Sequence, residues 1–180
     1  IGWISTLSKD GIGNLAPFSF FNALRDKPPF IMISVGCKTD GSKKDTVRNA
    51  EETGELVFNM ATWDTREKMS ETSWIEDPAI DELTEVGLTS LPSKLVKPVR
   101  VAESPAHFEC LYHDTYLLPG NDAKSVYHIV VAKVIGVHID DNYISEEGLV
   151  DILKMKPITR MGYMDYSAVE STFVMPKRTM

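Results

Sequence analysis

The chain has 180 residues, of which 43% are hydrophobic and 25% are charged, and its formal net charge is −7. This length and composition predict a single globular domain over residues 1–180, with enough residues to bury a core of its own. The acidic balance argues against a nucleic-acid partner, because the average surface would repel phosphates, and no apolar run reaches the roughly 18 residues of a membrane span.

The first two strand-like segments, Trp3–Ser8 and Asn14–Phe21, are separated by Lys9-Asp10-Gly11. Asp-Gly supplies the positive φ of a tight turn, so these segments are predicted to form a hairpin. Pro17 has no amide hydrogen for a sheet ladder, and the segment 14–20 is therefore expected to leave regular pairing and expose amides beside aromatic rings. Such a segment suits a flat heterocycle with polar edges. The alternative, which the pattern alone favours, is an edge strand with a proline-induced bulge.

Strand-like segments also dominate the rest of the chain. Val126–Val137 is rich in β-branched residues, which is typical of a strand covered on both faces. The proline-containing segment 89–105 is interpreted as a loop around one strand near Val99–Val101. Many strands with few helices predict a mainly β fold, an antiparallel barrel with peripheral helices. The remaining expected strands are Phe30–Val35, Leu56–Ala61 and Ala106–Tyr112, and the expected helices are Asp45–Thr53, Thr65–Thr72 with Asp64 as its N-cap, Asp81–Glu85 and Glu146–Lys154.

The residues at the start of the helix Asp45–Thr53 form a candidate anion site. Ser42 and Asp45 have the spacing of a capping box, with Asp in place of the usual Glu. The segment 42–46 also places two lysines and a threonine hydroxyl where a helix offers unpaired amides and the positive end of its dipole. This set suits a terminal phosphate, whereas the alternative is an ordinarily capped surface helix with solvated lysines.

Cys37 and Cys110 are far apart in the sequence and form no CxxC pair. They argue against a disulfide framework and are interpreted as packing residues with reduced thiols, as expected in a cytoplasmic protein. No export signal is visible. Because the chain begins at Ile1 instead of a methionine, we expect further residues upstream in the natural protein.

Six sequence segments carry a resemblance to a known family. They are GWISTLSKDGIGNLAPFSFFN, PPFIMISVG, KKDTVRNAEETGELVFNM, DELTEVGLT, ESPAHFEC and ITRMGYMDY, in this order from residue 2 to residue 166. Together they resemble the flavin reductase-like family, which includes flavoredoxin-type proteins. The resemblance implies an FMN-binding split β-barrel of antiparallel Greek-key type, a homodimer, and bound FMN as cofactor. FAD is less expected, because no GxGxxG dinucleotide motif is present.

The resemblance also implies a set of cofactor-binding residues. The segment around NLAPFSF would contact the flavin ring and ribityl chain, and the KDT segment lies on the phosphate side. Glu82 departs from some flavoredoxin-like relatives, which have a lysine in this segment, so any flavin contact from its loop is in doubt. The late arginine-glycine segment adds Arg160, with Tyr163 beside it. The implied residues are Asn14, Ala16, Pro17, Phe18, Ser19 and Phe20 for the ring end, Ser34, Lys44, Asp45 and Thr46 for the phosphate end, and Arg160.

No catalytic residue or metal site follows from the sequence. The spacing His107-x-Glu109 could put two ligands on one strand face, but nothing identifies the third ligand that a metal site requires, so the histidines are interpreted as structural or surface residues. Three functions stay open: an oxidoreductase in which NADH or NADPH transiently reduces bound FMN, a non-catalytic FMN electron carrier serving a redox partner protein, and a flavin-free interaction domain.

Overall fold

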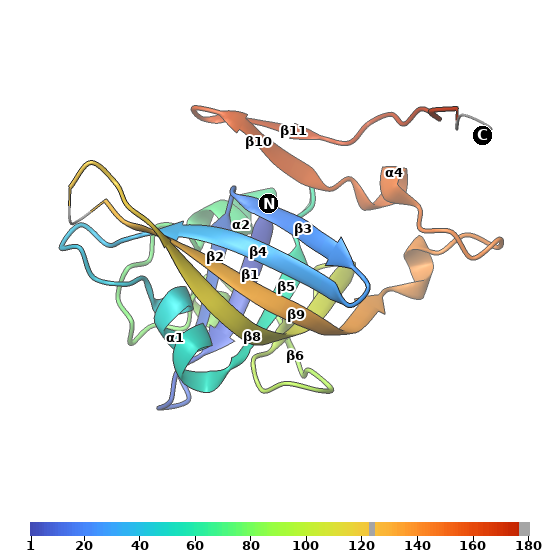
Figure 1. Ribbon diagram of the computed structural model, residues 1–180. Helices are drawn as coiled ribbons and strands as arrows, with labels where there is room; N and C mark the ends of the chain where they lie inside the picture. The colour runs from blue at the N-terminus through green and yellow to red at the C-terminus, as the bar shows by residue number, and fades with distance from the viewer. Residues whose placement is uncertain (123–124, 177–180) are drawn as a thin grey trace.

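The fold is known from a computed structural model that describes residues 1–122 and 125–176. Seven strands form one antiparallel sheet in the order β2-β1-β5-β8-β9-β4-β3 (Figure 1). The sheet curves into a barrel, and the apolar side chains on its inner face form the interior core (Figure 1). The strands are β1 (Gly2–Leu7), β2 (Gly13–Phe18), β3 (Phe21–Asp26), β4 (Pro29–Gly36), β5 (Glu55–Met60), β8 (Ala106–Leu118) and β9 (Tyr127–Ile139).

The two edges of the sheet, β2 and β3, are consecutive in the chain. Only Ser19 and Phe20 lie between them, so the chain crosses directly from one edge to the other. The amide of Ser34 in β4 donates to the Phe20 carbonyl at 2.9 Å. This hydrogen bond continues the pairing of β3 with β4, and the two-residue connection between β2 and β3 brings the edges together at one end of the barrel. The hairpin turn before β2 is as predicted, with Gly11 at φ 84°.

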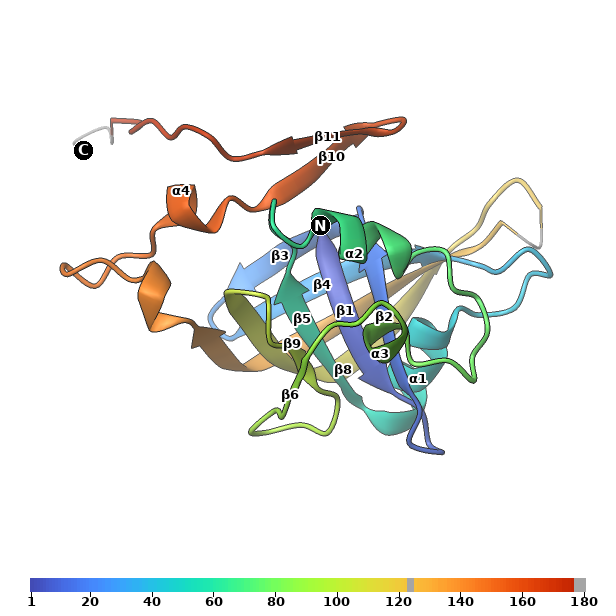
Figure 2. The same cartoon turned by 180° about the vertical axis from the view of Figure 1, so that it is seen from behind.

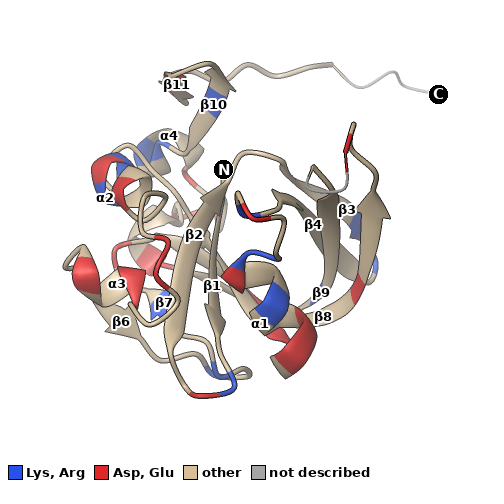
Figure 3. Ribbon diagram, turned by 90° about the vertical axis from the view of Figure 1, so that its left-hand side faces the viewer, with Lys and Arg blue, Asp and Glu red and all other residues tan. Residues whose placement is uncertain are grey.

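The barrel interior and its outer face hold two separate apolar clusters. The helix α1 (Asp45–Thr53) packs Val47 and Ala50 against the interior cluster, and Figure 3 shows this helix between the two groups of strands. The outer cluster contains Trp3 and Met69 and lies under α2 (Arg66–Glu71) and α3 (Glu82–Glu85), which cover β1, β2 and β5 in Figure 2. The helices are therefore peripheral, as the sequence predicts.

Polar side chains on the outer face of the sheet hold the proline-containing segment 89–105 in place. The Asn59 side chain accepts from the Val101 amide at 2.8 Å, and His107 Nε2 lies 2.8 Å from the Val101 carbonyl. Glu109, which is fully buried, accepts from the amides of residues 94, 95 and 96 at 2.9, 2.6 and 3.1 Å. The strand expected near Val99–Val101 is present as β7 (Arg100–Val101), and it pairs with a second short strand that was not expected, β6 (Ser90–Leu91).

Several predicted boundaries are wrong. The helix expected over Glu146–Lys154 is confined to α4 (Ile152–Met155), because Gly148 adopts φ 78° in a turn; a 3-10 turn, η1 (Asp141–Tyr143), precedes it. Asp64 does not cap α2, whose N-cap is Thr65. The strand expected over Ala106–Tyr112 continues to Leu118 past a register shift. The strand β3 and the hairpin of β10 (Ile158–Gly162) and β11 (Asp165–Ala168) were not predicted.

No helix in residues 1–122 and 125–176 is both long and apolar enough to cross a membrane. The β10–β11 hairpin and residues 169–176 stand apart from the seven-stranded sheet as an arm (Figure 1). Several apolar side chains of this arm are exposed to solvent, among them Tyr163 (92%) and Met164 (83%).

Candidate functional site

The strand β2 pairs regularly with β1 along its whole length, so the expected departure from pairing is wrong. Pro17 lies opposite Trp3, and the register does not shift. The amide of Leu15, two residues earlier, points away from β1 and donates to Glu82 Oε2 at 2.8 Å. Because amides alternate along a strand, the Pro17 nitrogen faces the same free edge, where no ladder hydrogen bond is lost. The edge-strand alternative is therefore correct, without its bulge.

A buried polar network joins β2 to α1. Asn14 Nδ2 donates to Thr46 Oγ1 at 2.9 Å and to Thr6 Oγ1 at 3.2 Å. Asn49 Nδ2 donates to the same Thr6 oxygen at 3.2 Å. Thr46 is only 1% exposed, so its hydroxyl is held in one place between the strand and the helix. Having accepted from Asn14, this hydroxyl keeps its own hydrogen to donate elsewhere.

The start of α1 has no side-chain cap, so the predicted capping box is wrong. Lys44 is the N-cap, and the Ser42 hydroxyl instead donates to Asp40 at 2.6 Å. The Asp45 carboxylate pairs with Lys38 at 2.8 Å and with Arg48, which leaves it no role as a cap. The amides of residues 45 and 46 donate no hydrogen bond to the described part of the chain.

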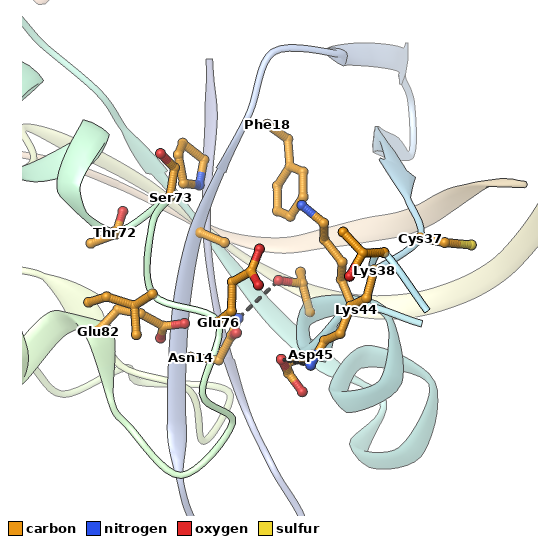
Figure 4. Close-up of a pocket in the computed structure, with 15 residues that line it drawn as sticks. Asn14, Phe18, Cys37, Lys38, Lys44, Asp45, Thr72, Ser73, Glu76 and Glu82 are labelled. Carbon is orange, nitrogen blue, oxygen red and sulfur yellow. Dashed lines mark hydrogen bonds and ion pairs between the residues drawn. The ribbon is translucent and has the colours of Figure 1, made fainter. Parts of the chain in front are cut away.

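Two adjoining cavities lie beside these elements. The first, of about 260 Å³, is enclosed by β2, the start of α1 and the loop before α3 (Figure 4). The second, of about 550 Å³, is lined by the β2–β3 link, β4 and the β10–β11 turn. Pro17, Phe18 and Lys44 line both cavities, so the two form one continuous site.

All eleven residues implied by the sequence resemblance line this site. Asn14, Ala16, Asp45 and Thr46 lie in the first cavity, Ser19, Phe20, Ser34 and Arg160 in the second, and the three shared residues in both. The structure thus brings together segments that are up to 146 positions apart, from Asn14 to Arg160.

The positively charged side chains of the site differ in whether they already have hydrogen-bond or ion-pair partners. The Lys44 ammonium group forms no ion pair or hydrogen bond with any described residue, although Lys44 lines both cavities. Lys38 is paired with Asp45. The Arg160 guanidinium donates twice to the Tyr163 carbonyl, at 3.1 and 2.6 Å, and so holds the turn of the arm. Lys44 is therefore the available cation for a negatively charged ligand.

Glu82 is the most perturbed acid of the site. It is 6% exposed, lines the first cavity and ties α3 to the free edge of β2 through the Leu15 amide. Burial raises the pKa of Glu82 to about 7, although the Leu15 amide opposes this, and the negative charges of Asp81 and Asp45 add to it. Near neutral pH this carboxyl group exchanges between its protonated and charged forms.

Sequence reasoning missed several lining residues. Lys38, Glu76 and Tyr127 come from loops and a strand end, and no local motif identifies them. Cys37 also lines the first cavity and donates from Sγ to the Val126 carbonyl at 3.2 Å, and it is half-buried. Cys110 is fully buried in the core, and burial raises the pKa of its thiol to about 12. Among residues 1–122 and 125–176, no group of three His, Cys, Asp or Glu side chains is placed to hold a metal.

Known proteins match both the sequence and the fold. The family model described as flavin reductase like domain matches residues 1–157. A relative from Aquifex aeolicus (strain VF5) is 40% identical over 162 residues, which cover 90% of this chain and 80% of that protein. Nitrilotriacetate monooxygenase component B from Bacillus cereus has a TM-score of 0.89 and 27% identity, over 97% of this chain and 85% of that one. A Shewanella frigidimarina NCIMB 400 protein with a split barrel domain has a TM-score of 0.84 and 20% identity, over 98% and 84%, and shares the fold.

Proposed function

This chain belongs to the flavin reductase-like family, and on that basis we propose that it binds FMN non-covalently and acts as an oxidoreductase. In this proposal NADH or NADPH reduces the bound flavin, which then passes electrons to free flavin, another small molecule or a partner protein. The observation that carries the proposal is the continuous site at β2, α1 and the β10–β11 turn, which combines an anion-binding end with an aromatic end.

The first cavity fits the phosphate end of FMN. A terminal phosphate needs converging donors and a mobile cation. The start of α1 offers the Thr46 hydroxyl, together with two amides and the Lys44 ammonium group, which have no partner among the described residues. Asp45 would be repelled by a phosphate, but its charge is already compensated by Lys38 and Arg48. These groups can neutralise and orient a phosphate without rearrangement of the helix.

The second cavity fits a planar ring. Phe18 and Pro17 supply apolar contact at the boundary of the two cavities, and Phe20 and Tyr127 pack edge to face with ring centroids 6.4 Å apart. Ser19 and Ser34 line the same space, so Ser34 lies with the proposed ring and not at the phosphate end, where the sequence resemblance placed it. A ring bound there would meet apolar surfaces together with a few polar groups that fix its orientation.

When bound, FMN supplies the hydride and electron chemistry that none of the amino-acid side chains can supply. The role of the protein is to hold the flavin and leave a ring face accessible to the donor. Phe20 is 61% exposed and Tyr163 is 92% exposed, so the aromatic end opens to solvent on the side of the arm. A nicotinamide would stack transiently there, since the sequence offers no dinucleotide motif to hold it.

A second candidate function is that of an FMN electron carrier that exchanges electrons with protein partners and does not react with nicotinamide. The missing dinucleotide motif favours this candidate, and the same site serves both functions. A flavin-free interaction domain is disfavoured, because all of the implied cofactor residues are present and line one site.

We also propose that the protein works as a homodimer in the cytoplasm, and the two free cysteines support the cytoplasmic location. The exposed apolar side chains of the arm argue for a second copy of this chain as their cover, because isolated apolar arms are rarely stable in water.

The experiment that tests the proposed function is an anaerobic reduction of the FMN-loaded protein. Purified protein, or protein mixed with FMN, is scanned for the oxidised flavin band and then mixed with NADH or NADPH in a stopped-flow instrument. Bleaching within seconds supports the oxidoreductase. If only dithionite bleaches the band, the carrier is correct, and if FMN does not bind, both are wrong.

A further inference from the structure

A separate cavity of about 380 Å³ lies on the outer face of the barrel, beneath the short ribbon of β6 and β7. Its walls come from this ribbon, from the start of β8 and from the end of β9. None of its lining residues belongs to the two cavities of the proposed flavin site. It is therefore a distinct feature of the fold, and the proposed oxidoreductase function makes no use of it.

The cavity is lined by a buried arginine that has no acidic partner among the residues that the structure describes. Arg100 is 8% exposed and forms no ion pair with a described residue. Its Nη2 donates to the Pro92 carbonyl at 2.8 Å, but its Nε is buried and donates to nothing. A buried charge without a partner is costly, and proteins normally pair such a group or use it to bind a ligand.

A second buried donor lines the same cavity. Ser104 is 3% exposed, and its hydroxyl has no hydrogen-bond partner among the described residues. The neighbouring His107 donates from Nε2 to the Val101 carbonyl. Burial lowers the pKa of His107 to about 4, and the positive charge of Arg100 adds to this effect. His107 is therefore neutral near pH 7, and Arg100 provides the fixed positive charge at this wall.

The nearby acids do not neutralise Arg100. Glu109 is occupied by three amides and by His138 Nε2 at 2.5 Å. Burial alone would raise the pKa of Glu109, but the hydrogen bonds from the backbone amides and from the His138 ring outweigh it, so the pKa is lowered. Glu109 therefore stays ionised and bound to these donors. Asp140 is exposed and accepts from the Asn142 amide at 2.9 Å.

We propose that this cavity binds a small organic monocarboxylate, whose oxygens accept hydrogen bonds from Arg100 and Ser104. The remaining wall includes Leu91, Val137 and Ile139, which suits a short apolar tail. One guanidinium group balances one negative charge. A phosphate dianion would leave an uncompensated charge near Glu109 and Asp140 and is disfavoured.

The test uses the full-length protein labelled with nitrogen-15 and the probe butyrate. The resonance of Arg100 Nε is assigned from its absence in Arg100→Lys, and its chemical shift is followed as butyrate is added. We expect a saturable shift at millimolar butyrate, while the Nε resonance of Arg66, a half-buried residue that does not line this cavity, does not move. Butanol, which has the same chain without the charge, and inorganic phosphate should both bind at least tenfold more weakly.

Two variants keep the test informative if Arg100→Lys does not fold. Ser104→Ala removes one donor and should weaken butyrate binding about tenfold, as expected for a hydrogen bond to a charged group. Ala102→Leu narrows the cavity mouth but keeps both donors, so it should weaken butyrate more than acetate. If butyrate leaves the Arg100 resonance of the wild-type protein unmoved, the two donors are satisfied by water and the proposal is wrong. Equal binding of butyrate by wild type and both variants would also overturn it.

Discussion

Asn14 Nδ2 lies 2.9 Å from Thr46 Oγ1, and this buried hydrogen bond joins the edge strand β2 to the first turn of α1. The two residues belong to the strand β2 and the helix α1, which form two halves of the cavity proposed for the phosphate end of FMN. Because the contact is made within the protein, the two halves are positioned relative to each other before any ligand binds. Such preorganisation lowers the cost of ordering side chains on binding.

The first prediction concerns Thr46→Val, which keeps the shape of the side chain and removes its hydroxyl. Thr46 is buried, only 1% exposed, so its hydroxyl group contributes to the stability of the apo protein as well as to the proposed FMN site. The variant leaves one Asn14 donor without a partner, so we expect a loss of about 1–3 kcal/mol in the free energy of unfolding. We also expect weaker FMN binding. Chemical denaturation of the apo protein and fluorescence titration with FMN measure the two effects.

A double-mutant cycle on the apo protein measures how much the Asn14–Thr46 hydrogen bond contributes to stability, apart from any effect on FMN binding. Asn14→Ala alone removes the same hydrogen bond from the other side, so its effect on apo stability and that of Thr46→Val should not add. Additive losses in stability would contradict the importance of this contact.

The second prediction separates the phosphate from the flavin ring. Lys44→Met removes a charge of the site that has no partner in the described part of the chain, and it nearly preserves the length of the side chain. A charge-assisted hydrogen bond contributes about 1.5–3 kcal/mol, so FMN should bind about ten- to a hundredfold more weakly. Riboflavin, which has no phosphate, should bind as before. Titration of each flavin by fluorescence quenching measures this difference.

The matched control is Lys43→Met. Lys43 is the preceding residue, lies outside both cavities and pairs with Glu51. The variant Lys43→Met removes the same charge from the same segment but outside the site, so its effect on FMN affinity should be much smaller than that of Lys44→Met. Equal effects of the two variants would indicate only long-range attraction, and the phosphate would then bind elsewhere.

The third prediction is a pH dependence of stability caused by Glu82. Burial raises the folded-state pKa of Glu82 to about 7, above the value near 4.5 of an unfolded chain. The unfolded state therefore releases this proton first, and stability that is fully present below about pH 4.5 is lost as the pH rises through 7. The loss reaches at most about 3 kcal/mol. Glu82→Gln keeps an acceptor for the Leu15 amide and should flatten this part of the profile.

Chemical denaturation of both proteins at pH values from roughly 4 to 9 tests the role of Glu82. This range spans the folded-state and unfolded-state pKa values of the carboxyl group. The variant should be more stable than wild type at the alkaline end, where wild-type Glu82 is a buried charge. Parallel pH profiles for the two proteins would show that Glu82 does not titrate in this range.

The sequence identified those parts of the fold and site that local patterns encode. The Asp-Gly turn, α1 and the buried strand β9 have clear signals of turn chemistry, helix termination and β-branching. The strand β3 was missed because five of its six residues are exposed, so it has no apolar alternation. Glu146–Lys154 was misread because its helical composition spans Gly148, whose positive φ ends any helix.

The residues that the sequence missed reach the site through tertiary structure. Glu82 is placed there by an amide of β2, 67 positions away, and Lys38 by the carboxylate of Asp45. The role of Asp45 could not be predicted from its spacing to Ser42. The same carboxylate can cap the helix or pair with two cations, and the sequence does not show that Lys38 and Arg48 lie within reach. The backbone amides of the segment 94–96 decide the role of Glu109 in the same way.

The last prediction concerns the oligomeric state and the arm. Met164 is 83% exposed in the β10–β11 turn, beside Tyr163 at 92%, and neither side chain packs on its own barrel. If a second copy covers them, the mass in solution is twice the 20.1 kDa of one chain. Met164→Lys places a charge in that contact, so it should weaken the dimer by at least tenfold without unfolding the monomer. Light scattering over a dilution series measures this shift.

The control Leu95→Lys adds the same charge to an exposed residue, 56% accessible, in the segment 89–105. That segment lies across the barrel from the arm (Figure 1), so this control should remain dimeric. A wild-type mass of one chain at micromolar concentration with flavin bound would rule out the dimer.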